Sequence, residues 1–234
     1  ALPISRLEDL IRAILKNTHN IGWFRLLYLY PSRITDGLIQ LIKDEPRICK
    51  YIDLPIQHIN DRILRLMNRH AAKKEIRKLI DKIRRQIPGV ALRTSVIVGF
   101  PSETDKEFDE LLRFIKEVKF ERLGAFIYSR EEGTKAYGLK GRISKKVKSA
   151  RFDAIMQAQR DVSNEVNRAF LGKVIDVLID AKEKDSYLGR SQHDAPEVDG
   201  NVYVKSGRVL KPGDFVRVKI IDTLEYDLVG EVAK

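Results

Sequence analysis

The sequence predicts an α/β domain built on a parallel sheet, followed by a small closed barrel of five antiparallel strands. Up to about residue 128, short apolar runs alternate with amphipathic helical segments, which is the pattern of parallel βα units. After Gly172, short alternating strands are separated by turn signals such as Asp199-Gly200 and Pro212-Gly213-Asp214. At 234 residues the chain is long enough for two domains, each with its own core.

The first domain contains four predicted strands and at least three predicted helices. The strands are WFRLLYLYP (23–31), YIDLP (51–55), RTSVIVGFP (93–101) and RLGAFIYS (122–129). Ser5 and Glu8 have the spacing of a helix capping box, and so do Thr104 and Glu107. The apolar faces of the helices comprise Leu7, Leu10, Ile11, Ile14 and Leu15, then Ile76, Leu79, Ile80, Ile83 and Ile87, then Phe108, Leu111, Leu112, Ile115 and Val118. Four strands without a closing set predict an incomplete barrel or an open sheet.

A long helix over residues 144–170 is predicted to connect the two domains. The strands expected after it are KVIDVLIDA, YLGRSQ, NVYVK, DFVRVKII and DLVGEV. Five short strands in about sixty residues fit a closed barrel of OB-like type. The predicted organisation is therefore a first domain over 1–143, a connecting helix over 144–170 and a barrel over 171–234.

The net charge of +11 indicates an acidic partner, with nucleic acid as the first candidate. That charge is unevenly distributed, because residues 172–234 contain 10 Lys+Arg and 12 Asp+Glu, a net of −2, which leaves +13 on residues 1–171. The single cysteine, Cys49, excludes an internal disulfide framework and a multi-cysteine metal site within the chain, and it suits a reducing cytoplasm. No apolar run approaches the length that crosses a bilayer, so we expect no membrane partner.

Unusual residues follow three predicted strands, at the ends where parallel βα proteins bind ligands. These segments are Ile56-Gln57-His58, Gly99-Phe100-Pro101-Ser102-Glu103-Thr104 and Tyr128-Ser129-Arg130-Glu131-Glu132-Gly133-Thr134. Gly99 would let a ligand approach the backbone, and the helix that begins near Thr104 offers free N–H groups to a carboxylate or a ribose hydroxyl.

Simpler roles compete with each of these assignments. The local pattern alone favours a plain strand-to-helix turn for Gly99 and Pro101, and Glu103 suits a helix N-terminus by its charge. His58 divides about evenly between a structural and a functional role, and Cys49 is expected to be a buried free thiol.

The segment 62–85 holds ten Lys+Arg against two Asp+Glu over a helical pattern. Such a run is typical of a solvated helix face. It lacks the regularly interleaved aromatic residues that stack on bases, so by itself it predicts nucleic-acid binding only weakly.

Several segments, taken in order along the chain, resemble the methylthiotransferase branch of the radical-SAM enzymes. They are YLYPSRIT (28–35), CKYIDLPIQHINDRILRLMNR (49–69), LRTSVIVGFPSET (92–104) and EEGTKAY (131–137). The segment after residue 171 is similar to the TRAM domain of the same enzymes. The resemblance covers nearly the whole chain, and it implies the C-terminal portion of a partial (βα) TIM-like radical-SAM barrel followed by a TRAM barrel.

Two types compete within this family. The RimO type modifies an aspartate of a small-subunit ribosomal protein, and the MiaB type modifies an adenosine of tRNA. DLPIQH (53–58) and DAPEVDGNVYV (194–204) resemble the RimO versions. A barrel of net −2 also suits a basic ribosomal protein better than a phosphate backbone. We therefore expect the RimO type, with Asp194, Glu197 and Asp199 binding the ribosomal protein, ribosomal RNA as a further partner of the basic region, and tRNA as the weaker alternative.

The resemblance implies radical chemistry on S-adenosylmethionine. In this family a [4Fe-4S] cluster on a CxxxCxxC loop donates an electron to S-adenosylmethionine, the adenosyl radical abstracts hydrogen from an unactivated C–H bond, and a second cluster delivers sulfur. The residues carried over from the family's motifs are Gly99, Phe100, Pro101 and Glu103 bordering the nucleoside, Gln57, Arg93 and Ser95 facing the barrel interior toward S-adenosylmethionine, and Tyr128 beside the adenine.

The chain departs from the family because the cysteines of both clusters are missing. The first two strands of the family's six are also missing, so we expect a fragment that holds no iron–sulfur cluster and is inactive alone. Ser102 stands where glycine is common in the family. If the chain is instead a complete gene product, a non-catalytic ribosome-binding or RNA-binding module is the alternative.

Overall fold

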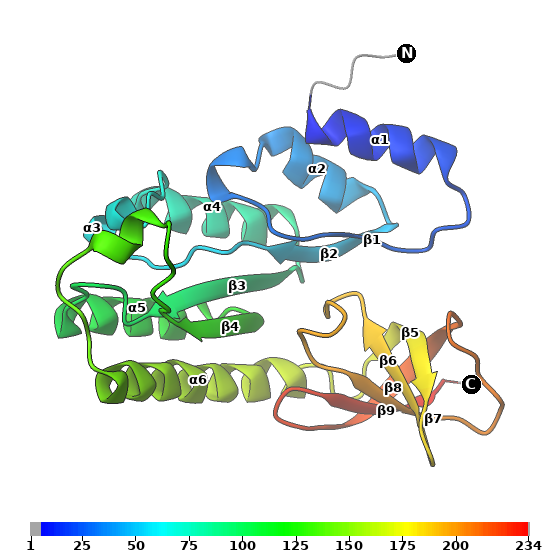
Figure 1. The fold of residues 1–234 in the computed structure, drawn as a ribbon. Helices are drawn as coiled ribbons and strands as arrows, with labels where there is room; N and C mark the ends of the chain where they lie inside the picture. The colour runs from blue at the N-terminus through cyan, green and yellow to red at the C-terminus, as the bar shows by residue number, and fades with distance from the viewer. Residues whose placement is uncertain (1–5, 234) are drawn as a thin grey trace.

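A computed structural model of the chain describes residues 6–233, which form two domains joined by a long helix (Figure 1). The elements of the first domain are α1 (Leu7–Asn17), β1 (Phe24–Leu26), the 3₁₀ helix η1 (Pro31–Arg33), α2 (Asp36–Asp44), β2 (Ile48–Asp53), α3 (Asp61–Leu66), α4 (Lys73–Gln86), β3 (Ala91–Val98), α5 (Asp105–Val118), β4 (Arg122–Ile127) and the 3₁₀ helix η2 (Lys135–Gly138). The joining helix α6 (Lys145–Arg168) is followed by β5 (Val174–Lys182), β6 (Tyr187–Ser191), β7 (Val202–Lys205), β8 (Phe215–Thr223) and β9 (Leu228–Val232).

The four strands of the first domain form one parallel sheet in the order β1-β2-β3-β4. This confirms the α/β class and the parallel sheet. The first strand is shorter than the sequence predicts, because Tyr28 has a left-handed backbone (φ 58°) and its N–H donates to the Asp53 carboxylate at 2.9 Å instead of to a neighbouring strand. The capping box of Thr104 and Glu107 opens α5 as expected, whereas Ser5 lies outside the described residues.

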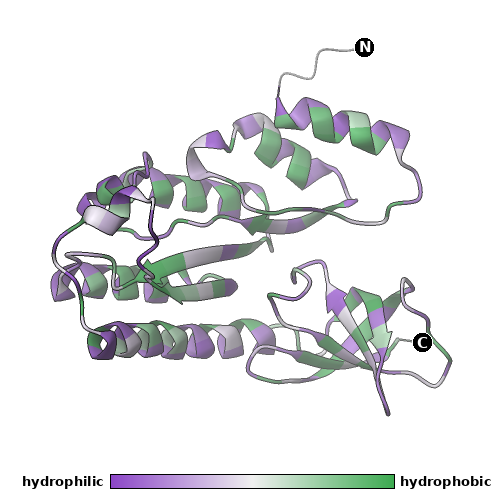
Figure 2. Ribbon diagram, in the orientation of Figure 1, coloured by the Kyte–Doolittle hydropathy of each residue, from purple (hydrophilic) through white to green (hydrophobic). Residues whose placement is uncertain are grey.

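The two faces of the sheet have different coverings. Side chains such as Leu92, Val96 and Val98 belong to the main hydrophobic core with the helices. Figure 2 shows hydrophobic residues running through β3 and alternating with hydrophilic ones along α4, α5 and α6. The opposite, inner face carries Tyr51, Arg93 and other side chains that meet the second domain or line a cleft. This inner face is therefore where polar chemistry gathers.

The second domain is a closed five-stranded barrel in the order β5-β6-β7-β9-β8. Closure and strand number agree with the prediction, but one pairing is not antiparallel, because β7 and β9 run in the same direction. A ring with an odd number of strands cannot alternate direction at every pair, so at least one parallel pair is required in a closed ring of five. Buried valines such as Val177, Val202 and Val218 fill the barrel.

Helix α6 runs along β4 and α5 and ends at the barrel. Ser144 caps its first turn by accepting a hydrogen bond from the Val147 N–H. At the other end, the buried Asn167 amide donates to backbone carbonyls of the β8–β9 turn, the nearest being Leu224 O at 3.2 Å. Within residues 6–233, no helix is both long and apolar enough to cross a bilayer.

The β6–β7 segment of the barrel packs against the inner face of the sheet, near the N-terminal ends of the strands. Asp194 pairs with Arg122, whose Nε lies 2.8 Å from the carboxylate. The Asp199 carboxylate accepts from the Tyr51 hydroxyl at 2.6 Å and faces the Arg93 guanidinium at 3.3 Å. These pairs join strands of one domain to a loop of the other.

This interface differs from the expectation that three acidic residues bind a partner. Asp194 is 2% exposed and the Asp199 carboxylate 3% exposed, and both are occupied by partners within the chain. Only Glu197 of the three is exposed to solvent. Burial raises the pKa of Asp199, opposed by the Tyr51 hydrogen bond and nearby arginines. Two of the three residues are therefore structural in this arrangement.

We expect Asp194→Asn to destabilise the protein by about 3–5 kcal/mol, because it leaves the buried Arg122 guanidinium without an anion. Urea unfolding followed by circular dichroism measures the change. Glu197→Gln is the matched control in the same loop, and its effect should stay within about 0.5 kcal/mol since Glu197 is exposed. Equal effects of the two substitutions would contradict a structural role for the ion pair.

A pH dependence should come from His193, which follows β6 and lies beside Phe170, with ring centroids 5.4 Å apart and ring planes tilted by 56°. Burial lowers the pKa of His193 to about 4 from an ordinary 6.5. The unfolded chain thus binds a proton that the folded chain does not, so stability is present above about pH 6.5 and is lost as the pH falls toward 4.

We expect wild-type protein to lose on the order of 1 kcal/mol per pH unit from this residue between about pH 6 and 4.5. The comparison is thermal unfolding of wild type and His193→Gln across that range, with the exposed His70→Gln as control. Parallel pH profiles for wild type and His193→Gln would contradict the assignment.

Candidate functional site

A cleft of about 380 Å³ opens on the inner face beyond the C-terminal ends of β3 and β4. It is lined by Gln57, Leu66, Met67, Asn68, Arg69, Ile97, Phe100, Phe126, Ile127, Tyr128, Ser129, Thr134, Lys135 and Ala136. This position agrees with the general rule for parallel βα proteins. The second domain fills the other end of the same face, so the sheet is closed at one end and accessible at the other.

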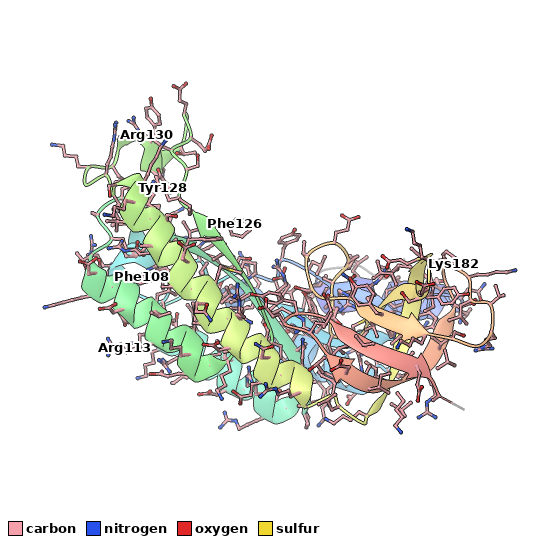
Figure 3. All side chains as sticks on the ribbon, turned by 90° about the horizontal axis from the view of Figure 1, so that it is seen from below. Phe108, Arg113, Phe126, Tyr128, Arg130 and Lys182 are labelled. Carbon is pink, nitrogen blue, oxygen red and sulfur yellow. The ribbon has the colours of Figure 1, made fainter. Side chains whose placement is uncertain are left out.

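Aromatic and aliphatic side chains supply the apolar part of the cleft. Phe100 and Tyr128 meet edge to face, with ring centroids 5.1 Å apart. Ile97 and Phe126 lie on neighbouring strands in register, and Phe126 is 55% exposed. The Tyr128 hydroxyl is buried and has no hydrogen-bond partner among residues 6–233. Figure 3 shows Phe126 and Tyr128 near the N-terminal end of α6. Flat apolar walls of this kind suit a planar base.

Gln57 places a free amide at the cleft. Its backbone is left-handed (φ 69°), and it forms an isolated bridge with β3, its N–H donating to Ser95 O and its carbonyl accepting from Ile97 N–H. The backbone is thus fully engaged, whereas the side-chain amide has no bonding partner within the part of the chain described. It can accept or donate a hydrogen bond to a ligand.

Glu103 does not line the cleft, and its side chain is fully buried behind the turn that follows β3. Its carboxylate accepts from the Gly99 N–H at 2.6 Å and from Arg151 of α6 at 2.6 Å, and it lies 3.1 Å from His58 Nε2. His58 in turn accepts from the Asn60 N–H through Nδ1, at 2.9 Å. Glu103 therefore positions the strand-end turns.

Gly99 and Pro101 line a smaller pocket on the other side of Tyr128. Gly99 has φ +74°, and a Cβ there would collide with the aliphatic stem of Lys148. The close approach that the glycine permits is therefore to α6 and not to a ligand on this face. Ser102 is also left-handed (φ 64°), which is the backbone state that favours the glycine common in the family at this position.

Arg93 and Ser95 lie deeper on the inner face, toward the second domain. Arg93 Nη1 donates to Asp53 at 3.1 Å and is 3.4 Å from the Ser95 hydroxyl. Burial alone would lower the pKa of Arg93, but the carboxylates of Asp199 and Asp53 outweigh it and raise that pKa. The guanidinium is thus paired with protein carboxylates, and neither residue lines the cleft.

The cleft contains residues that sequence reasoning did not select, among them Ile97, Phe126 and Asn68. Ile97 could have been found from the sequence, because side chains alternate along a strand and Ile97 therefore shares one face of β3 with Arg93 and Ser95. Asn68 carries no comparable pattern, since it enters through a left-handed turn after α3 (φ 57°).

Two family models match the chain. A model described as the radical SAM superfamily matches residues 2–115, and a TRAM domain model matches residues 171–233. The chain therefore carries a radical SAM domain followed by a TRAM domain.

The similarity to curated relatives extends over both domains of the chain. The chain is 49% identical over 96% of its length to "Ribosomal protein uS12 methylthiotransferase RimO" of Caldanaerobacter subterraneus subsp. tengcongensis, covering 51% of that protein. It is 48% identical over 97% of its length to the protein of the same name in Geobacter sulfurreducens, again covering 51%. The chain therefore spans about half the length of the curated relatives it matches.

A solved structure supports the fold alone. Coproporphyrinogen III oxidase (HemN) from Escherichia coli, described as a radical SAM enzyme, superposes with a TM-score of 0.52 at 21% identity. The match covers 70% of this chain and 37% of HemN.

Enzymes of this family use S-adenosylmethionine and iron–sulfur clusters, and the residues present fit only the first. The cleft volume is within the usual range for small-molecule sites, and the unpartnered Tyr128 hydroxyl and free Gln57 amide offer polar contacts. A [4Fe-4S] cluster needs several thiolates, whereas Cys49 is single and buried. Burial also raises the pKa of its thiol. No cluster of three or more His, Cys, Asp or Glu side chains in residues 6–233 is arranged to hold a metal.

The turn at Ser102 depends on the loop before α6, and a glycine substitution tests this. Gly141 has φ +82°, and a Cβ there would lie 3.0 Å from the Ser102 backbone, whose N–H donates to Gly141 O at 2.7 Å. Gly133 has a similar φ of +79° with open space around it. We expect Gly133→Ala to cost about 1 kcal/mol from its backbone conformation, and Gly141→Ala clearly more. Chemical unfolding measures both, and equal destabilisation would mean that the packing against Ser102 is unimportant.

Proposed function

We propose that this chain supplies the S-adenosylmethionine cleft and the TRAM domain of an enzyme that methylthiolates an aspartate of ribosomal protein uS12. The observation that carries the proposal is the match of nearly half of all residues, across both domains, to relatives that bear this activity in their names. A match to the TRAM segment alone would have left the substrate open, because the MiaB type also carries this domain. The MiaB alternative is not favoured, since the curated relatives described above are named as the RimO type.

S-adenosylmethionine would occupy the cleft at the ends of β3 and β4. We assign the adenine to the apolar walls formed by Phe100, Tyr128 and Ile97, and the polar end of the molecule to Gln57 and its neighbours. When bound, S-adenosylmethionine supplies the radical and methyl-transfer chemistry of the family. Glu103 would act indirectly, because its carboxylate accepts a hydrogen bond from the Gly99 N–H and so positions the turn after β3.

The cluster ligands of the enzyme would come from residues other than those of this chain. One buried cysteine cannot replace the three thiolates of a CxxxCxxC loop. In this proposal, the chain binds S-adenosylmethionine and the substrate protein. Residues outside this chain hold the clusters that supply the electron and the sulfur. A cytoplasmic location accompanies this proposal, because the substrate is a ribosomal protein.

The TRAM domain would bind the basic ribosomal protein through its exposed carboxylates. Asp194 and Asp199 are occupied inside the chain, so the binding surface falls on exposed residues such as Glu183, Asp185 and Glu197. Neutralising these three side chains leaves the domain interface untouched. The surface is thus separable from the interface by mutation.

The test is a salt-series titration of this chain against purified uS12 and against tRNA. We expect preferential binding to uS12, weakened at least fivefold by Glu183→Gln, Asp185→Asn and Glu197→Gln together. The control with the same charge change is Asp81→Asn, Asp109→Asn and Asp153→Asn, all exposed on helices of the first domain and the joining helix, and it should change affinity less than twofold. Tighter binding to tRNA with a steep salt slope would overturn the proposal in favour of the MiaB type.

A further inference from the structure

The cations of the first domain fall into two groups that differ in their pairing. Along α3 and α4, basic residues face acidic residues of α5 and the following turn. The pairs are Arg62–Glu107, Lys73–Glu110, Arg77–Glu117 and Arg84–Glu121, with N–O distances of 2.6–3.1 Å. The Arg62 hydrogen bond lowers the pKa of Glu107 to about 2. Much of the basic run at 62–85 is therefore neutralised within the molecule.

The segment from Arg130 to Lys148 is different. It contains seven Lys+Arg and two Asp+Glu, and none of the seven forms a salt bridge within the described part of the chain. The two carboxylates are held locally, Glu131 by the Ser129 hydroxyl and Glu132 by the Tyr137 hydroxyl. The segment therefore keeps a net charge of 7 − 2 = +5, with no ion pair to a cation of its own among the described residues. We call residues 130–148 the basic lip.

Three of these cations surround the small pocket behind the cleft. The pocket has a volume of about 90 Å³ and is lined by Gly99, Pro101, Tyr128, Arg130, Ala136, Leu139, Arg142, Ile143 and Lys148. No carboxylate is among the lining residues. Figure 3 places Arg130 on the loop beyond the N-terminal end of α6, with Tyr128 beside that end. The cavity is of the size of one small ion and is positive on several sides.

The cations at the pocket have N–H groups that form no hydrogen bond within the described structure. Arg130 uses Nε to donate to Tyr137 O at 2.9 Å and stacks on that ring, which leaves both terminal nitrogens without a partner in the described structure. Arg142 has no partner within residues 6–233. Lys148 donates once, to Tyr128 O at 2.8 Å, and burial lowers its pKa with no carboxylate to offset it. The first turn of α6 contains no acidic residue, so the helix end adds to the positive potential.

We propose that this pocket binds a phosphate group of RNA, and that the basic lip around it is an RNA-binding surface. The free N–H groups of Arg130, Arg142 and Lys148 can donate hydrogen bonds to the oxygens of one phosphate. The unpaired lysines of the basic lip can contact neighbouring phosphates of the same RNA strand. Tyr128 lines both this pocket and the cleft. An RNA segment bound in this pocket would lie next to the cleft, where the substrate protein is proposed to react. The choice of RNA as the source of the phosphate rests on the proposed function, because a ribosomal substrate is surrounded by RNA.

The experiment measures the anisotropy of a fluorescein-labelled single-stranded RNA of mixed sequence, about 12 nucleotides long, with the full chain at about 50–300 mM salt. We expect Arg130→Gln with Arg142→Gln to weaken binding at least fivefold at about 100 mM salt. The slope of log affinity against log salt should flatten by about 0.7 for each phosphate that the variant no longer neutralises.

Lys74→Gln with Lys78→Gln is the matched control. Both lysines are exposed on α4 and unpaired in the described structure, so the change in net charge is identical. We expect less than a twofold effect from this pair. Equal weakening by both pairs would reduce the finding to net charge and overturn the site, as would the absence of measurable binding by wild type.

Inorganic phosphate tests the pocket independently. We expect millimolar phosphate to raise the thermal unfolding temperature of wild type at constant ionic strength, and Arg142→Gln to abolish the rise. A phosphate effect without RNA binding would leave a small-anion site and overturn the RNA assignment. Neither measurement requires uS12 or turnover, so failure here is distinguishable from failure of the proposed function.

Discussion

Two arginines on the inner face of the parallel sheet, Arg93 and Arg122, impose the constraint on which the arrangement of this protein depends. Both are buried, and a buried guanidinium is tolerated only with a carboxylate in contact. The second domain supplies Asp199 and Asp194 for this purpose. The barrel is therefore held against the N-terminal half of the sheet face by charge pairing, at a place where each partner would be costly without the other.

Closing one half of the face determines what the other half can do. The barrel loop and the Asp53–Arg93–Asp199 network fill the end of the inner face nearest the strand N-termini. The C-terminal ends remain accessible, and the cleft with Gln57, Phe100 and Tyr128 opens there. The same sheet thus has one end closed by the second domain and one end that opens into the cleft. A change in the position of the TRAM domain would move the Arg93 side chain, which donates a hydrogen bond to the Ser95 hydroxyl. The backbone carbonyl of Ser95 in turn accepts the hydrogen bond from the Gln57 N–H, at the edge of the cleft.

The sequence predicted the sheet, the barrel and the position of the cleft because these follow from local signals. Alternating runs, capping boxes and strand-end glycines are properties of a few neighbouring residues. The roles of Glu103 and Asp194 were not accessible in this way. The family resemblance implies that Glu103 borders a ligand, but its carboxylate accepts a hydrogen bond from Arg151, which lies 48 residues further along the chain. Asp194 is separated from Arg122 by 72 residues, and no local pattern indicates such a pair. The parallel pairing of β7 with β9 is likewise a property of the closed ring.

For the same physical reason, a count of charges along the sequence does not reveal which cations remain unpaired. The excess of cations at 62–85 is conspicuous in sequence, yet α5 presents carboxylates to several of them, so the field beyond the surface is weaker than the count implies. Residues 130–148 have fewer cations but keep them unpaired, beside a pocket and the positive end of a 24-residue helix. Long-range attraction depends on the charge that remains after pairing. The glutamates of α5 thus neutralise part of the charge along α4, whereas the unpaired cations of residues 130–148 lie next to the cleft.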